Sequence, residues 1–195
     1  MPQHFKNNGY KTLSIGKVYH NVDDDKEAWD DLVKLPGENW RDIPAFEIGT
    51  EEKDDDYYVD GRTTKYVMDK VVDLKEDNFF YAVGYARPHL PFNCPKKYWD
   101  MYPASTIKLT DIKERPRNGY NKAIRTGGEL KNYYGMPELY DEIDDNMALK
   151  LRRAYYACVS YADAQVGKLV NKLETLGIRD KTIIVLWGDH GYKLG

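Results

Sequence analysis

Two runs of consecutive, largely apolar residues constrain the fold most: residues 79–83 (FFYAV) and residues 183–187 (IIVLW). Each run has the length of a β-strand and lacks alternation with polar residues, which is typical of strands buried on both faces of a parallel sheet. A third strand is predicted at residues 13–15, where Leu13 and Ile15 alternate with polar neighbours and Gly16 ends the pattern.

Helical patterns separate these strands. The best-defined helix keeps an apolar stripe for some thirty residues from Asp144, and Gly177 ends it. Another helix takes Thr63 or Thr64 as its N-cap and runs to about Leu74. Short helices are expected from Pro2 and from Pro95. Helices that alternate with strands in this way predict an α/β fold, with a largely parallel sheet flanked by helices.

Two stretches lack a clear period. Residues 103–140 carry proline, glycine and charges and predict a long surface connection. Residues 21–60 are acidic and irregular, and we interpret them as a solvated surface insertion. An EF-hand loop counted from Asp56 would place Gly61 at its sixth position, but Val67 stands where the bidentate glutamate is required.

Composition narrows the partners. The chain has 195 residues, enough for one sizeable domain, and its net charge of -3 with no basic stripe argues against a nucleic-acid binder. No apolar run approaches the roughly 20 residues that cross a bilayer, and the polar start MPQHFKNNGY shows no signal peptide. Two cysteines do not make a disulfide framework. We therefore expect neither nucleic acid nor a membrane as partner.

Polar and titratable residues follow all three predicted strands. Because ligands bind at the carboxyl ends of strands in parallel sheets, we expect these residues to share one site. Taken singly, each has a plain structural reading: a histidine at a strand end is usually hydrogen-bonded structure, and a Gly-Asp pair is usually a turn. The residues are Lys17 and His20 after the first strand, Arg87 and His89 after the second, and Asp189 and His190 after the third.

The chemistry of this set points to ester hydrolysis. A lysine and histidines supply charge-assisted donors for a tetrahedral oxyanion. An aspartate beside them can hold a divalent cation that polarises the same group. A remaining histidine can protonate a leaving alkoxide near neutral pH. The set suits hydrolysis of a sulfate or phosphate ester, although it contains no nucleophile.

Four motifs, in their order and spacing, resemble type I sulfatases of the alkaline-phosphatase-like superfamily, and most of all the iduronate-2-sulfatase-like branch. The motifs are GKVYH, VGYARPHLPF, SYADAQVGKLVNKL and WGDHGYKLG. The resemblance spans nearly the whole chain and implies that residues 1–195 are the central part of the N-terminal α/β catalytic domain, incomplete at both ends. It implies a sulfuric ester hydrolase with a sulfated carbohydrate as substrate.

The resemblance also implies roles for single residues. Lys17 is expected to bind the sulfate oxygens and the catalytic aldehyde hydrate, and His20 to hydrogen-bond and activate that hydrate. His89 is expected to contact the bridging ester oxygen as general acid. Asp189 is the expected calcium ligand, with His190 beside it as a second ligand or a sulfate contact. Calcium prefers oxygen ligands, which favours Asp189.

Arg87 has two open interpretations. It either orients its loop or meets a carboxylate of the substrate, and a surface arginine is an equal alternative to both. We carry it as a candidate substrate-binding residue together with Lys17 and His89.

The departures from the family pattern concern the nucleophile and the metal. Such sulfatases make a formylglycine from the Cys or Ser of C/S-x-P/A-x-R, and this motif is absent: the surroundings of Cys94, Cys158 and Ser160 all fail it. Both cysteines are therefore expected to be structural, and the formylglycine is expected upstream. Because further calcium ligands are also missing, the chain by itself is expected to be inactive and to bind calcium weakly.

Two other functions stay open. One is a phosphate or phosphonate ester hydrolase of the same superfamily, and the other is a non-catalytic domain that binds anionic carbohydrate through the same Lys and His cluster. Within the leading hypothesis, the first guess for the substrate is an O-sulfated sugar, such as a 2-O-sulfated uronate of a glycosaminoglycan. The family is typically periplasmic, secreted or lysosomal.

Overall fold

The computed structural model describes residues 1–20, 25–37, 43–112, 114, 117–120, 128–136, 143–188, 190–192 and 194. These residues belong to two compact units. Unit 1 comprises Met1–Glu38, Lys53–Arg87 and Tyr161–Gly188, and unit 2 comprises Asn39–Glu52, Pro88–Ser160 and Asp189–Gly195.

The centre of unit 1 is a three-stranded parallel sheet. Its strands are β1 (Lys11–Gly16), β2 (Asp31–Val33) and β4 (Phe79–Gly84), in the order β2-β1-β4. β1 and β4 pair along their whole length, so that Gly16 lies opposite Gly84 at the carboxyl end. Leu13 and Ile15 are buried. The prediction of a parallel sheet is confirmed for these two strands.

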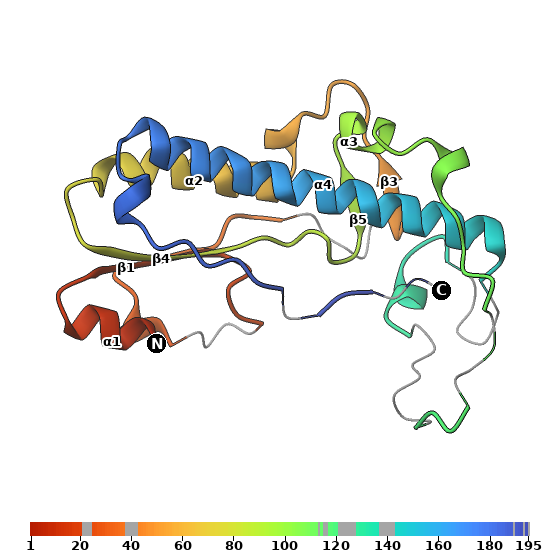
Figure 1. Ribbon diagram of the computed structural model, residues 1–195, viewed down its shortest axis with the longest axis horizontal. Helices are drawn as coiled ribbons and strands as arrows, with labels where there is room; N and C mark the ends of the chain where they lie inside the picture. The colour runs from red at the N-terminus through yellow and green to blue at the C-terminus, as the bar shows by residue number, and fades with distance from the viewer. Residues whose placement is uncertain are drawn as a thin grey trace. The chain divides into compact units, whose positions relative to one another are not determined.

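Helices cover both faces of this sheet (Figure 1). The short α1 (Pro2–Asn7) lies against one face, where the Phe5 ring stacks on Phe80 of β4 with 4.6 Å between centroids. On the other face lies α2 (Val59–Asp73), which buries Val67 and Val71. The α/β architecture expected from the sequence is therefore present in unit 1.

The start of α2 is held by α4 (Asp145–Thr175), whose residues from Tyr161 onward belong to unit 1. The Tyr161 hydroxyl accepts a hydrogen bond from the Gly61 backbone N–H at 2.7 Å and donates one to the Asp55 carbonyl at 3.0 Å. A Cβ on Gly61 would come within 1.8 Å of that same carbonyl, so only glycine fits this packing. One tyrosine thus fixes both sides of the turn that opens α2.

Unit 2 contains a two-stranded parallel sheet of β3 (Phe46–Ile48) and β5 (Phe92–Cys94), followed by α3 (Lys96–Asp100). Its core includes Phe92, Cys94, Trp99 and Cys158. Both cysteines are buried and form no disulfide, in agreement with a structural role. Short 3-10 helices complete the two units: η1 (Lys26–Ala28), η2 (Asp55–Tyr57), η3 (Ala104–Thr106), η5 (Leu130–Asn132) and η6 (Arg179–Lys181).

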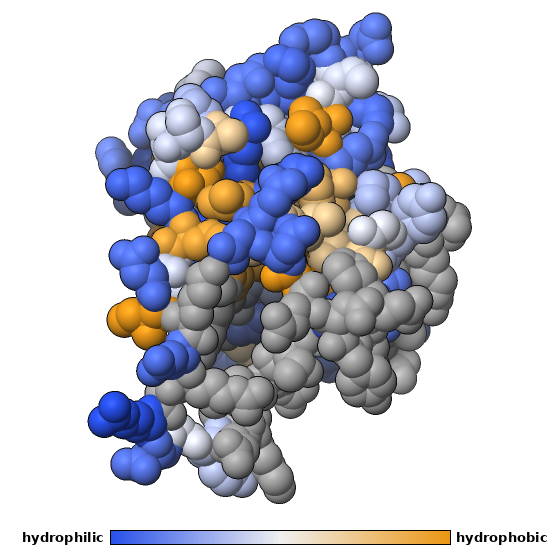
Figure 2. All heavy atoms as spheres, turned by 90° about the vertical axis from the view of Figure 1, so that its right-hand side faces the viewer, coloured by the Kyte–Doolittle hydropathy of each residue, from blue (hydrophilic) through white to orange (hydrophobic). Residues whose placement is uncertain are grey.

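On the face drawn in Figure 2, most of the coloured residues are hydrophilic. Among the residues coloured in Figure 2, hydrophobic side chains lie between hydrophilic ones on the face that is drawn. No helix within the described ranges combines the length and the apolar character that crossing a bilayer requires.

Three sequence predictions need correction. First, α2 begins at Val59 and not at Thr63 or Thr64. Both threonines are buried inside the helix, where the Thr64 hydroxyl donates to the Asp60 carbonyl one turn back, at 2.9 Å. They therefore pack within α2 instead of capping it.

The second correction concerns residues 183–187, which were expected to form a buried strand. They form no strand, and Ile183 and Trp187 keep 93% and 71% of their surface exposed. An apolar run becomes a strand only when a neighbour completes its hydrogen bonds, and the sheets of the described residues give it none. The third correction is that residues 21–60, expected to be irregular, contain β2 and β3.

We predict that Tyr161→Phe destabilises the protein by about 1–3 kcal/mol, because the Gly61 N–H is then buried without its acceptor. Urea unfolding measures the change. Tyr156→Phe is the matched control, since Tyr156 lies on the same helix and is exposed. Equal unfolding midpoints for the two variants would contradict the role given to the Tyr161 hydroxyl.

Candidate functional site

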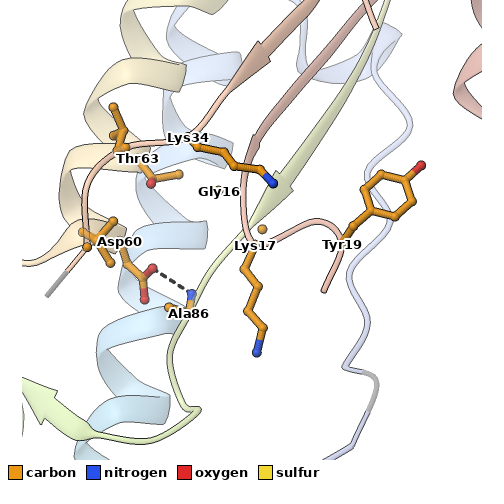
Figure 3. A pocket seen from close by; sticks show the side chains of 11 residues that line it. Gly16, Lys17, Tyr19, Lys34, Asp60, Thr63 and Ala86 are labelled. Carbon is orange, nitrogen blue, oxygen red and sulfur yellow. Dashed lines mark hydrogen bonds between the residues drawn. The ribbon is translucent and has the colours of Figure 1, made fainter. Parts of the chain in front are cut away.

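A pocket of about 270 Å³ opens at the carboxyl ends of the strands in unit 1 (Figure 3). It lies where ligands bind in parallel α/β sheets. Its wall combines the residues that follow β1, β2 and β4 with the first turns of α2. The lining residues are Gly16, Lys17 and Tyr19 at and after the end of β1, Lys34, Leu35 and Gly37 after β2, Gly84 and Ala86 at and after the end of β4, and Val59, Asp60 and Thr63 of α2.

Two glycines bring the ends of β1 and β4 together beside this pocket. A Cβ on Gly16 would lie 2.2 Å from the Gly84 carbonyl oxygen, and a Cβ on Gly84 would lie 2.1 Å from the Lys17 carbonyl carbon. The Lys17 N–H donates to the Gly84 carbonyl at 2.9 Å. Gly16 also has a φ of +77°, which non-glycine residues rarely adopt. These contacts fix the backbone from which the Lys17 side chain leaves.

Two lysines give the pocket a positive side. Lys17 and Lys34 follow neighbouring parallel strands, so both lie at the same edge of the sheet. Both side chains are exposed, so each can approach a ligand in water. Two ammonium groups beside one cavity suit an anion, because each donates charge-assisted hydrogen bonds.

A buried carboxylate forms the opposite wall. Asp60 is 2% exposed, and its two oxygens accept hydrogen bonds from the backbone N–H groups of Ala86 and Arg87, each at 2.8 Å. Figure 3 shows the Asp60 side chain directed toward Ala86. Asp60 also stands in the first turn of α2, where the helix dipole favours a negative charge.

The charge of Asp60 influences its neighbour on α4. Burial raises the pKa of the Tyr161 hydroxyl well above its ordinary value, and the negative charge of Asp60 raises it further. The positive charge of Arg87 acts in the opposite direction and lowers this pKa. Tyr161 is therefore a neutral hydrogen-bonding group at physiological pH and not a candidate acid or base.

Three of the predicted site residues belong to unit 1. Lys17 lines the pocket, whereas His20 is exposed in the bend after β1 and is not among the lining residues. Arg87 is only 6% exposed, with its N–H on Asp60. That burial excludes the interpretation of Arg87 as an ordinary surface arginine.

Two more predicted residues belong to unit 2. The His89 ring is half-buried: Nδ1 lies 2.9 Å from the Leu90 carbonyl oxygen, and Nε2 lies 3.2 Å from a carboxylate oxygen of Glu129. The ring of Tyr192 meets it edge-on at 5.9 Å. His190 is exposed, and Asp189 lies outside the described residues.

Sequence reasoning missed two residues of the pocket. Lys34 follows a strand of only three residues within an acidic stretch, too short for a periodic signal. Asp60 is the fifth residue of the EF-hand loop that Val67 rules out, and it was not considered further, although its position before an apolar helix is a usable sign of a helix start.

The described residues do not form a calcium site by themselves. Nowhere in the described ranges do three or more His, Cys, Asp or Glu side chains gather closely enough to hold a metal ion. Ca²⁺ generally takes six to eight oxygen ligands. The carboxylates of the described residues do not supply such a set.

We predict that Gly84→Ala destabilises the protein by about 1–3 kcal/mol or more, because its Cβ must displace the backbone of Lys17. Gly167→Ala is the control: it lies in α4 with nothing within 4 Å of the added Cβ, and it should stabilise the helix by up to about 1 kcal/mol. Thermal unfolding distinguishes the two. A Gly84→Ala variant as stable as the unsubstituted protein would contradict the close contact.

Comparison with known proteins places this fold in a family. The profile of the sulfatase family matches residues 1–195. The chain is 31% identical to the human (Homo sapiens) iduronate 2-sulfatase and 28% identical to a sulfatase of Formosa agariphila, and both matches cover 100% of the chain. It is also 28% identical, over 60% of its length, to the multifunctional alkaline phosphatase superfamily protein PehA of Trinickia caryophylli, of which the match covers 24%.

The chain spans 40% of the human relative and 42% of the Formosa agariphila relative. Its match to the family profile nevertheless runs over every residue of the sequence. The chain belongs to the sulfatase family, and its α/β architecture is that of the family.

Proposed function

We propose that the chain is the central part of the catalytic domain of a sulfuric ester hydrolase that removes sulfate from an O-sulfated sugar. The observation that carries this proposal is the sulfatase profile, which matches residues 1–195. The pocket at the carboxyl ends of β1, β2 and β4 supports it, because its two lysines suit an anionic group.

Lys17 is the proposed sulfate-binding residue. It extends from a backbone position held by Gly16 and Gly84, and it lines the pocket. Sulfate esters accumulate negative charge on oxygen as the bond to the leaving group breaks. An ammonium group beside the sulfate therefore stabilises the negative charge of the reacting group in the transition state.

His89 is the proposed general acid. Both of its ring nitrogens lie near acceptor oxygens, from the Leu90 carbonyl and the Glu129 carboxylate. An imidazole donates from both nitrogens only when it is protonated. The two acceptors fix the orientation of the ring, which supports its proposed role in proton transfer to the leaving alkoxide.

The remaining assignments rest on the family resemblance alone. His20 is proposed to assist the nucleophile, and Arg87 to act near the substrate. Asp189 and His190 are proposed as metal ligands. The formylglycine nucleophile and the Ca²⁺ ion likewise belong to the proposal through the resemblance only.

The substrate class follows from the relatives. The human relative is named an iduronate 2-sulfatase. We infer a 2-O-sulfated uronate of a glycosaminoglycan as the first substrate to test. Lys34 could meet a second anionic group of such a sugar, since it lies beside the same pocket as Lys17.

A second candidate is a phosphate or phosphonate ester hydrolase. The similarity to a multifunctional member of the alkaline phosphatase superfamily favours testing it. Phosphate and sulfate esters both present tetrahedral oxyanions to the same lysine. Parallel assays with a sulfate monoester and the matching phosphate monoester distinguish the two activities.

We predict that Lys17→Ala lowers kcat/KM for a sulfate ester by about 100-fold or more in the protein encoded by the complete open reading frame. Lys11→Ala is the matched control. Lys11 stands at the other end of β1, where it pairs with Asp77 at 2.6 Å on the surface, and such pairs contribute little. If both variants keep the activity of the unsubstituted protein, Lys17 is not the sulfate-binding residue.

We also predict that residues 1–195 alone hydrolyse no sulfate ester, because the chain holds no formylglycine motif. The product of the complete open reading frame is expected to be active under the same conditions. Release of sulfate from a chromogenic ester measures both. Turnover by the 195-residue chain itself would overturn the proposed nucleophile.

A further inference from the structure

The residues at the end of β4 need a fixed backbone if they are to act on a substrate. Ala86 lines the pocket, Arg87 follows it, and Pro88 then leads to His89. The segment is neither helix nor strand, so no regular ladder holds it. Its backbone N–H groups at Ala86 and Arg87 are instead taken up by one side chain, the carboxylate of Asp60.

The geometry of this contact is that of a clamp. Each oxygen of Asp60 accepts one N–H, both at 2.8 Å, a distance typical of a strong hydrogen bond to a carboxylate. Two consecutive peptide groups are thereby held against one planar carboxylate. A carboxylate as buried as Asp60 is costly unless such bonds compensate it, so the contact is strongly constrained on both sides.

Asp60 is itself held in place. The adjacent Gly61 N–H donates to the Tyr161 hydroxyl at 2.7 Å, and the Asp60 carbonyl accepts from the Thr64 hydroxyl at 2.9 Å. The first turn of α2 is therefore anchored before it reaches the end of β4. The hydrogen bonds from Ala86 and Arg87 to Asp60 therefore fix this part of the pocket wall relative to α2.

We propose that Asp60 is a positioning residue for the sulfatase reaction, which sets the backbone of Ala86 and Arg87 at the wall of the pocket in unit 1. The inference rests on the proposed function, in which Arg87 and His89 act near the substrate. Asp60 does not touch the reacting atoms in this role. It acts through the two peptide groups that it binds.

The test uses Asp60→Asn in the protein from the complete open reading frame. An amide matches the carboxylate in shape but places an NH₂ group against one of the two N–H donors. Amide hydrogen exchange at Ala86 and Arg87 is expected to accelerate by about tenfold or more, while exchange in the sheet stays unchanged. Asp69→Asn, an exposed position on α2, is the charge-matched control and should leave both rates unchanged.

Steady-state kinetics separate positioning from general stability. Asp60→Asn is expected to lower kcat by about tenfold with a smaller change in KM, because displaced backbone at Ala86 and Arg87 weakens contacts with the transition state more than substrate binding. Asp60→Glu keeps the charge and should recover part of the loss. Asp69→Asn should keep the kcat of the unsubstituted protein.

The possible results have separate meanings. Unchanged exchange at Ala86 and Arg87 in Asp60→Asn overturns the clamp, and faster exchange with unchanged kcat overturns the positioning role. If Asp60→Asn does not fold, the unsubstituted protein decides, since fast exchange at both amides would itself overturn the clamp. Absence of sulfate ester turnover in the unsubstituted protein rejects the proposed function, while the exchange rates still show whether the clamp exists.

Discussion

The close backbone contact between the ends of β1 and β4 is the constraint on which the pocket depends. Gly16 and Gly84 lie opposite each other in the register, and neither tolerates a Cβ without moving the other strand. Because the chain leaves β1 at this point, the same contact decides where Lys17 stands. A parallel sheet brings the carboxyl ends of its strands to one edge. Here the lack of a Cβ at Gly16 and Gly84 allows the ends of β1 and β4 to approach closely.

The start of α2, on one face of the same sheet, is fixed by hydrogen bonds to α4. Tyr161 reaches the start of the helix and the preceding turn with one hydroxyl, and Asp55 receives a further ion pair from Lys168 at 2.6 Å. Hydrogen bonds among buried groups contribute little net free energy when made, but losing one partner is expensive. The helix start is therefore held by polar contacts with a specific geometry, on which the placement of Asp60 relies.

Local sequence signals predicted the elements that are long or sharply bounded. The predicted boundaries are close to the observed ones for three elements. The signals were the glycine that ends β1, the apolar run of β4 and the apolar stripe of α4. The strands β2, β3 and β5 have three residues each, so periodicity does not distinguish them from loops. The start of α2 was placed five or six residues late, because Thr63 and Thr64 resemble N-caps until their burial is known.

The sequence predicted the kind of site, but not all of the residues that form it. Lys17 could be chosen because it follows a recognisable strand, whereas Lys34 follows one that periodicity does not reveal. Asp60 binds Ala86 and Arg87, which lie 26 and 27 positions further along the chain. Contacts between residues so far apart cannot be predicted from local patterns in a single sequence. The motifs were therefore sufficient to predict the fold and the family. The contacts that support the site could be found only in the structure.

The exposed run at residues 183–187 governs how the isolated chain behaves in solution. Five consecutive apolar residues without charge or proline have the composition of aggregation-prone segments. In the described part of the chain, β4 pairs only with β1 and so offers its outer edge as a template. We therefore expect self-association of the isolated chain, in which the run 183–187 of one molecule pairs with β4 of another, to increase with protein concentration.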